Sequence, residues 1–304
     1  MIELTDVTKR YGATVAVDHL SFEVRPGEVT GFLGPNGAGK STTMRMIVGL
    51  DTPTSGRVTV DGRPYRELRF PLRHVGALLE ARAIHPGRSA RNHLRWLADS
   101  NAINRRRVDE VIELVGLTDV ADRRSGGFSL GMGQRLGIAT ALLGDPGTLL
   151  LDEPVNGLDP EGIQWIRQLL RSLAAEGRSI LVSSHLMSEM ALTADRLIVV
   201  GRGRLITEGT VGDLVRQAST GYVRVDAAEP ERLEHLLAGA GGHVSADPDG
   251  FLVVTGMEAR DVGIVAGTAG ITLYELSPRS ASLEQAFMEL TRDAVEYTTR
   301  GAAA

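Results

Sequence analysis

Residues 34–41 have the types and the spacing of a phosphate-binding loop. They read Gly-Pro-Asn-Gly-Ala-Gly-Lys-Ser and match the pattern G-x-x-x-x-G-K-[ST] without a gap. Glycines let backbone N–H groups surround a phosphate, because no side chain intervenes. The loop lies between a predicted strand, residues 28–33, and a predicted helix, residues 41–50, whose positive end would point at the same anion. The pattern predicts that Lys40 reaches the terminal phosphates of a nucleotide and that Ser41 ligates Mg²⁺.

The phosphate loop comprises residues 34–42. The residues expected to surround the phosphates are Gly34, Pro35, Asn36, Gly37, Ala38, Gly39, Lys40, Ser41 and Thr42.

Lysine is rare in this chain, which strengthens the expectation for Lys40. Of the 33 basic residues only Lys9 and Lys40 are lysines, and arginine supplies the rest. A compact ammonium suits a phosphate loop, whereas a planar guanidinium would not fit there. Lys9 is expected to be a solvated surface residue.

Two adjacent carboxylates, Asp152 and Glu153, follow the apolar run 148–151, which has the composition of a buried parallel strand. Alone, such a pair is a common polar exit from a strand. Beside a phosphate loop, it predicts that Asp152 holds Mg²⁺ and that Glu153 orients and deprotonates an attacking water. Asp159 follows shortly after the pair. His185 ends the next predicted strand and could touch the γ-phosphate region.

Apolar periodicity predicts the elements that must position these residues. Residues 1–60 read as short alternating strands, and residues 89–145 are mostly helical. From 147 onward the pattern alternates: a strand at 148–151, a helix from Pro160 to Ala175 and a strand at 179–184. This order predicts an α/β fold with a mostly parallel sheet.

A change of composition near residues 210–221 predicts a second, smaller α+β domain. Strands at 222–226, 243–246, 251–255 and 271–276 and helices at 230–240 and 259–266 follow the order βαββαβ, the split-βαβ or ferredoxin-like arrangement. A closing helix places Leu283, Phe287 and Leu290 on one face. The tail 296–304 is predicted to be disordered.

Bulk composition sets limits on the function. The 304 residues fit one large domain and one smaller domain, and a net charge of −5 gives no basic excess for a nucleic-acid partner. Cysteine is absent, so disulfides and thiolate metal sites are excluded. No signal-peptide pattern and no apolar run of 18 residues is found, so another chain is expected to supply any membrane part.

Six features in a fixed order resemble the nucleotide-binding domains of ABC transporters. An aromatic residue, Tyr11, stands where that family stacks adenine, and the phosphate loop follows. Residues 128–132, the signature segment, resemble the LSGGQ motif. The carboxylate pair, the Asp159 loop and the switch histidine, His185, complete the order.

The resemblance covers about residues 1–215 and implies a P-loop NTPase fold of ABC type that binds and hydrolyses ATP with Mg²⁺. It implies a mostly parallel core sheet, an antiparallel N-terminal β subdomain and a helical subdomain at about 85–145. Residues 221–295 are then a C-terminal α+β accessory domain.

Two departures from the family pattern stand out. The signature segment keeps Ser129 and Gly131 but has Leu130 and Met132 in place of a glycine and a glutamine. A helix that starts here could still cap a γ-phosphate. Glu80 follows the predicted strand 74–79 and stands where the family has a glutamine near Mg²⁺. Its carboxylate could ligate the ion but adds charge near the phosphates.

Both departures and the C-terminal helix resemble one branch of the family, the ATPases of bacitracin-type, lantibiotic and daunorubicin-type exporters. This implies a separately encoded ABC-2 type membrane permease as partner and export of a drug, antibiotic or peptide. It also implies a cytoplasmic subunit held at the inner face of the cell membrane through that permease. Two copies would sandwich two ATP molecules head to tail, with Ser129 and Gly131 of one copy facing the phosphates bound by the other.

Two alternatives remain open from the sequence. An ABC ATPase of the DNA-repair or translation type usually has two ATPase domains, a coiled coil or a zinc insertion. This chain has one phosphate loop, no cysteine and no heptad run. A non-enzymatic, nucleotide-dependent regulatory module is disfavoured by the presence of Asp152, Glu153 and His185.

Overall fold

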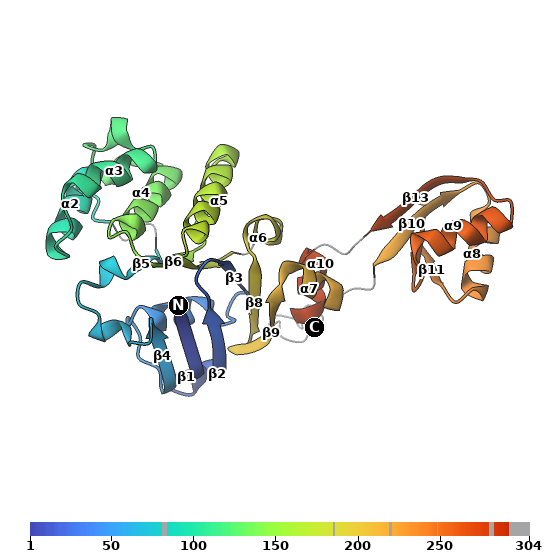
Figure 1. Cartoon of the computed structure of the whole chain (residues 1–304), viewed down its shortest axis with the longest axis horizontal. Helices are drawn as coiled ribbons and strands as arrows, with labels where there is room; N and C mark the ends of the chain where they lie inside the picture. Colours follow the sequence, from blue (N-terminus) through green and yellow to red (C-terminus); the bar gives the residue numbers. More distant parts are fainter. Residues whose placement is uncertain (81–83, 185, 219–220, 248, 280–282, 292–304) are drawn as a thin grey trace, which may run out of the picture. The chain divides into compact units, whose positions relative to one another are not determined.

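The computed structural model describes residues 1–80, 84–184, 186–218, 221–247, 249–279 and 283–291 (Figure 1). The chain divides into two compact units, one containing Met1–Thr210 and the other Val211–Leu290. Each unit has its own hydrophobic core.

A six-stranded sheet forms the centre of the first unit. Its strand order is β5-β6-β7-β3-β8-β9, and every neighbouring pair is parallel except β8 with β9. The bounds are β3 Val29–Leu33, β5 Val75–Leu78, β6 Thr148–Asp152, β7 Ser179–Ser183, β8 Arg196–Gly201 and β9 Arg204–Thr210. The predicted mostly parallel sheet is confirmed. The carboxyl ends of β3, β6 and β7 lie at one edge, and the residues with candidate chemistry follow these ends.

Three antiparallel strands form a second sheet in this unit, in the order β2-β1-β4. They are β1 Ile2–Tyr11, β2 Thr14–Val24 and β4 Ser55–Val60. The sequence predicts short strands here, but β1 and β2 are 10 and 11 residues long. Register shifts between them interrupt the alternation of two, so each long strand looks like several short ones. Phe22 of β2 and Phe32 of β3 join the two sheets, with ring centroids 5.4 Å apart.

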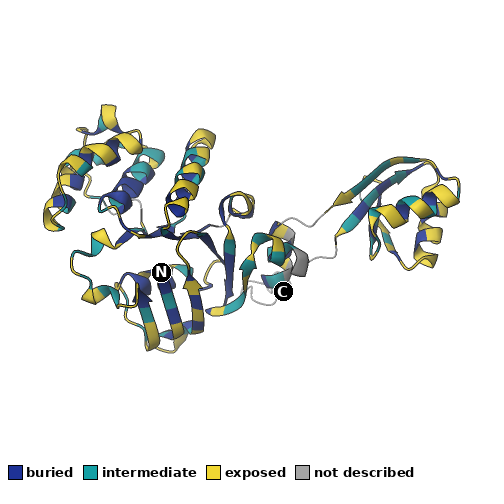
Figure 2. Cartoon of the chain, viewed as in Figure 1, coloured by how far each residue is buried: buried dark blue, intermediate teal, exposed yellow. Residues whose placement is uncertain are grey.

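Several helices of the first unit have a buried side, dark blue in Figure 2, and an exposed side, yellow. The predicted helical stretch is confirmed as α2 Ala90–Ser100, α3 Arg106–Leu114 and α4 Leu130–Leu142. The remaining helices of this unit are α1 Lys40–Ile47, α5 Pro160–Ala175 and α6 Met187–Thr193. α1 is shorter than predicted because Gly49, at φ +68°, adopts a left-handed conformation just after it.

The second unit begins with α7 Val211–Ala218 and ends with α10 Leu283–Thr291, whose last residue clusters with the first unit. Between them lie β10 Tyr222–Ala227, α8 Pro230–Gly239, β11 His243–Ala246, β12 Leu252–Thr255, α9 Ala259–Thr268 and β13 Leu273–Arg279. The sheet is antiparallel with the order β11-β12-β10-β13. This is the predicted split-βαβ arrangement. The predicted tail 296–304 lies outside the described residues.

None of the helices in the described ranges is both long and apolar enough to cross a bilayer.

Replacing Phe32 with alanine should destabilise the first unit by about 3–5 kcal/mol, because the side chain is fully buried and joins two sheets. Tryptophan fluorescence during urea unfolding reports this unit alone, since both tryptophans, Trp96 and Trp165, lie in it. Leu192→Ala is the control, because Leu192 is 51% exposed, and should change the free energy of unfolding by no more than about 0.5 kcal/mol. An equal loss of unfolding free energy in both variants would contradict the role of Phe32 in joining the two sheets.

Candidate functional site

The phosphate loop connects the end of β3 to the start of α1 and depends on glycine for its shape. Gly39, the residue before α1, has φ +94°, and a Cβ added there would lie 2.5 Å from the carbonyl oxygen of Ala16. A Cβ on Gly34 would lie 2.5 Å from the carbonyl oxygen of Val200. A larger residue at either position would therefore clash with backbone. The backbone of the loop can bend around an anion at the start of α1.

Lys40 lies folded against this loop. Its ammonium donates hydrogen bonds to the carbonyl oxygens of Gly34 at 2.6 Å and Pro35 at 3.3 Å. Burial lowers the pKa of Lys40, while the negative charges of Glu153 and Asp152 oppose that shift. A partly desolvated ammonium would interact strongly with phosphate oxygens.

Asp152, at the end of β6, joins three elements. One carboxylate oxygen accepts a hydrogen bond from the Ser41 hydroxyl in α1 at 3.0 Å. The other accepts from the Ser183 hydroxyl at the end of β7. The parallel register places Asp152 directly opposite Ser183. The predicted partners Ser41 and Asp152 are therefore in contact, although they are 111 residues apart in sequence.

Hard oxygen donors are what Mg²⁺ prefers, and it usually takes one or two carboxylates together with waters and substrate phosphates. The contact between Ser41 and Asp152 beside the phosphate loop fits that donor set. In the part of the chain that the structure describes, no group of three or more histidine, aspartate or glutamate side chains could hold a metal by itself.

Glu153 has an unusual backbone conformation. Its φ is +50°, a left-handed value that costs free energy for a residue with a side chain. Its N–H donates to the Ser183 carbonyl at 3.2 Å and to the Ser183 hydroxyl at 3.1 Å. Its carbonyl accepts from the Gln134 side chain at 3.0 Å. Such strain persists only where surrounding contacts hold it, and it is common at functional sites.

The sequence did not identify Ser183 and Gln134 as site residues. For Ser183 a signal was present, because parallel pairing of the predicted strands 148–151 and 179–184 brings their polar ends together. Gln134 lies inside a helix whose register against the carboxylate strand cannot be obtained from periodicity.

The signature segment forms the start of α4. Ser129 is the residue before the helix, and its hydroxyl oxygen accepts a hydrogen bond from the Met132 N–H at 3.2 Å. A Cβ on Gly131 would lie 2.8 Å from the carbonyl oxygen of Gly157, so only glycine fits against that loop. Leu130, which stands where the family has glycine, contacts Gly157 and is 49% exposed.

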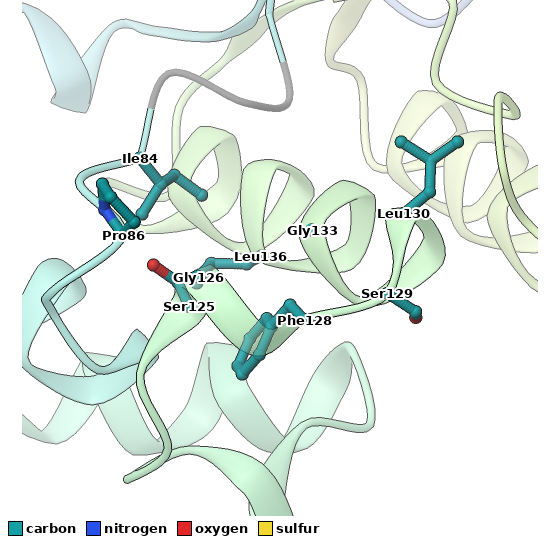
Figure 3. A pocket seen from close by; sticks show the side chains of 9 residues that line it. All are labelled: Ile84, Pro86, Ser125, Gly126, Phe128, Ser129, Leu130, Gly133 and Leu136. Atoms are coloured by element: carbon teal, nitrogen blue, oxygen red, sulfur yellow. The ribbon is translucent and has the colours of Figure 1, made fainter.

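A cavity of about 400 Å³ lies beside the signature segment (Figure 3). Phe128 and Leu136 line it together with Ile84 and Pro86. In Figure 3 Ser129 and Leu130 lie at the start of α4 and extend in different directions. Residues at the start of α4 and residues near position 84 therefore line the same cavity.

Tyr11, at the end of β1, presents its ring to the surface. The side chain is 48% exposed, and its hydroxyl donates to Asp51 at 2.9 Å. Burial and this hydrogen bond raise the pKa of Tyr11. Lys9, expected to be simply solvated, lies over the ring at 4.9 Å and donates to the Thr52 carbonyl at 2.7 Å. These contacts hold an aromatic surface of the kind on which a base can stack.

Three further predicted site residues have distinct surroundings. Glu80 is exposed and lines a cleft of about 650 Å³ that also includes Ser41 and Asp152. Asp159 accepts a hydrogen bond from the Gly162 N–H at 2.9 Å and so caps α5. His185 lies outside the described residues.

Comparison with known families gives two matches. A model described as ABC transporter matches residues 17–156, and a model described as a domain of unknown function (DUF8746) matches residues 221–284.

Three relatives show the range of similarity. The uncharacterized ABC transporter ATP-binding protein YhcH of Bacillus subtilis (strain 168) is 38% identical over 301 residues, 97% of each chain. The bacitracin transport ATP-binding protein BcrA of Bacillus licheniformis is 44% identical over 211 residues, 68% of this chain and 69% of that protein. The Nod factor export ATP-binding protein I of Rhizobium etli is 34% identical over 297 residues, 95% and 93% of the two chains.

Solved structures give the same picture for the first unit. An ATP-binding subunit of an ABC transporter superposes with a TM-score of 0.67 at 28% identity, over 71% of this chain and 92% of that chain. The dimeric ABC transporter cassette MJ0796 gives 0.65 at 27% identity, and its post-hydrolysis state bound to ADP and Pi gives 0.64 at 27%. Both matches cover 69% of this chain and 98% of that chain.

The Ser183→Ala variant should lose about 1–3 kcal/mol of stability, because the Asp152 carboxylate loses a buried donor and the Glu153 N–H loses an acceptor. Urea unfolding followed by tryptophan fluorescence measures the change. Ser172→Ala, on the exposed side of α5, is the matched control and should remain within about 0.5 kcal/mol of the unaltered protein. If both variants have the same free energy of unfolding, Ser183 does not hold Asp152 and Glu153 in place.

Proposed function

This chain belongs to the ABC transporter ATP-binding family, whose cassettes hydrolyse ATP, and on that premise we propose that it is the ATP-driven subunit of an exporter. The observation that carries the ATP-driven part of the proposal is the contact of Ser41 with Asp152, next to the half-buried Lys40 and the strained Glu153. In the proposed scheme these groups would supply positive charge for the terminal phosphates and a base for water.

Each residue has a defined task in this scheme. The backbone of Gly34–Thr42 and the Lys40 ammonium would bind the β- and γ-phosphates, and adenine would stack on the exposed ring of Tyr11. Ser41 and Asp152 would hold Mg²⁺, with Glu80 as a further candidate ligand. When bound, the ion supplies positive charge that balances the phosphates. Glu153 would take the proton of the attacking water, and His185 would contact the γ-phosphate.

The signature segment supports a site shared by two copies. The chain has one phosphate loop, yet the start of α4 is a second place suited to a phosphate, with Ser129 and Gly131 at its N-terminus. A dimer is the form in which the cassette MJ0796 has been solved. In the proposed homodimer, each ATP contacts the phosphate loop of one copy and Ser129 and Gly131 of the other, with Asp159 in the adjoining loop.

Export and the membrane partner rest on the relatives. BcrA is named for bacitracin transport and the Rhizobium etli protein for Nod factor export. By analogy, the partner is a separately encoded permease of the ABC-2 type, and this chain works at the cytoplasmic face of the membrane without a nucleic-acid partner. Residues 80–91 would pass the motion on to the permease. Residues 1–215 are the proposed ATP-binding domain, and residues 221–295 an accessory domain.

The Glu153→Gln variant should bind ATP and lose turnover by about 10²–10⁴-fold, because an amide cannot accept the proton of water. With ATP and Mg²⁺ it should elute as a dimer on gel filtration, since closed dimers would no longer open by hydrolysis. Glu161→Gln, on an exposed position in the first turn of α5, is the control and should behave like the unaltered protein. A Glu153→Gln protein that stays monomeric and binds no ATP would rule out the shared site.

Both Lys40→Ala and Lys40→Arg should lower the rate of phosphate release by about 10²–10³-fold. Alanine removes the charge, and the guanidinium of arginine is too large for the space in which the ammonium contacts Gly34 and Pro35. Phosphate release with saturating ATP measures the effect, and Arg95→Ala is the control because it removes an exposed positive charge outside the loop. Turnover at the original rate in Lys40→Ala would remove Lys40 from its role.

A further inference from the structure

Gln134 is a buried polar side chain in the middle of a helix, and it points at the backbone of Glu153. It lies in α4, five residues after Ser129, and is 3% exposed. Its side-chain amide donates a hydrogen bond to the carbonyl oxygen of Glu153 at 3.0 Å. A buried amide that uses its donor on one backbone oxygen fixes the distance between that helix and that residue.

The backbone of Glu153 is held on both sides. Its carbonyl also accepts from the Asn156 N–H at 3.2 Å, and its N–H is bound by Ser183. With φ at +50°, the direction of the Glu153 side chain depends on these contacts, because a relaxed backbone would turn the carboxylate elsewhere. Gln134 is the side-chain donor among them that comes from outside the sheet.

The start of α4 contacts the same segment a few residues further on. Gly131 lies against the Gly157 carbonyl, and Leu130 packs on Gly157 itself. Helix α4 therefore contacts the segment 153–157 at two places: Gln134 at Glu153, and the helix start at Gly157. A displacement of the helix start would be transmitted to the Glu153 backbone through a short, packed path.

We propose that Gln134 is a positioning residue that holds Glu153 in its left-handed conformation and links the signature end of α4 to the base of the same subunit. The inference rests on the proposed function. Ser129 and Gly131 face the ATP bound mainly by the other copy, so Gln134 makes the geometry of one Glu153 respond to the nucleotide in the second site. Its amide binds the Glu153 carbonyl, so its effect is confined to where the Glu153 carboxylate points.

The test uses Gln134→Leu in the full-length chain. Its kcat for ATP should fall by about 10–100-fold, because a small displacement of a catalytic group is costly, while KM changes by no more than about twofold. The Hill coefficient for ATP should fall toward 1, since the link between the two sites is lost. Ile138→Val is the matched control: it alters a buried side chain of the same helix and should leave kcat, KM and the Hill coefficient unchanged.

A second variant, Gln134→Glu, covers the case in which leucine prevents folding. Burial raises the pKa of such a carboxyl, and its neutral form can again donate a hydrogen bond to the Glu153 carbonyl. The ratio of its kcat to that of the unaltered protein should therefore rise as the pH is lowered from about 8 to about 6.

The proposal is overturned if folded Gln134→Leu hydrolyses ATP with the original kcat, if its loss equals that of Ile138→Val, or if the Gln134→Glu ratio is flat with pH. Failure of the underlying function looks different. In that case the unaltered protein itself releases no phosphate from ATP, and Glu153→Gln makes no difference.

Discussion

The site depends on the pair of hydrogen bonds that the Asp152 carboxylate accepts. Its two oxygens each accept a hydrogen bond from a hydroxyl, one from Ser41 of α1 and the other from Ser183 of β7. The phosphate loop, the carboxylate strand and the next parallel strand are thereby held in one arrangement. Ser183 extends that arrangement to the N–H of Glu153. An ion bound by Ser41 and Asp152 and a base on Glu153 would therefore be positioned by the same short network.

The residues around this network combine left-handed backbone conformations with partial burial of a charged group. Gly39 takes a left-handed conformation that only glycine adopts without cost, whereas Glu153 takes one at a cost and is fixed by hydrogen bonds at both its N–H and its carbonyl. Lys40 is partly desolvated, with two carboxylates near enough to favour its charged form. Hydrogen bonds within the protein fix these groups, which reduces the free energy needed to organise the site on binding.

The sequence predicted the parts that follow from local pattern. The phosphate loop, the carboxylate pair after an apolar strand and the βαββαβ order all depend on residues close together in the chain. What it missed depends on distant pairing. Ser183 acquires its role from the register of β7 against β6, and Gln134 from the way α4 packs across the segment after β6. The sequence pattern predicts short strands in place of the long β1 and β2, because register shifts break the alternation of buried and exposed residues.

Leu130 shows how a departure from a motif can have a structural reason. It stands where the family has glycine, and it packs on Gly157, which has φ +76° and no side chain to obstruct the contact. The substitution therefore adds an apolar contact between α4 and the loop before α5 and leaves Ser129 and Gly131 at the helix start. The two residues proposed to face ATP are retained.

The most direct test of the shared-site account is the rate of phosphate release per molecule, measured over a wide range of protein concentrations at saturating ATP and Mg²⁺, with light scattering on the same samples. If two copies must close on each ATP, the rate per molecule rises with concentration and levels off where scattering shows the dimer. A rate per molecule that is constant throughout, from a chain that remains monomeric, would contradict the account.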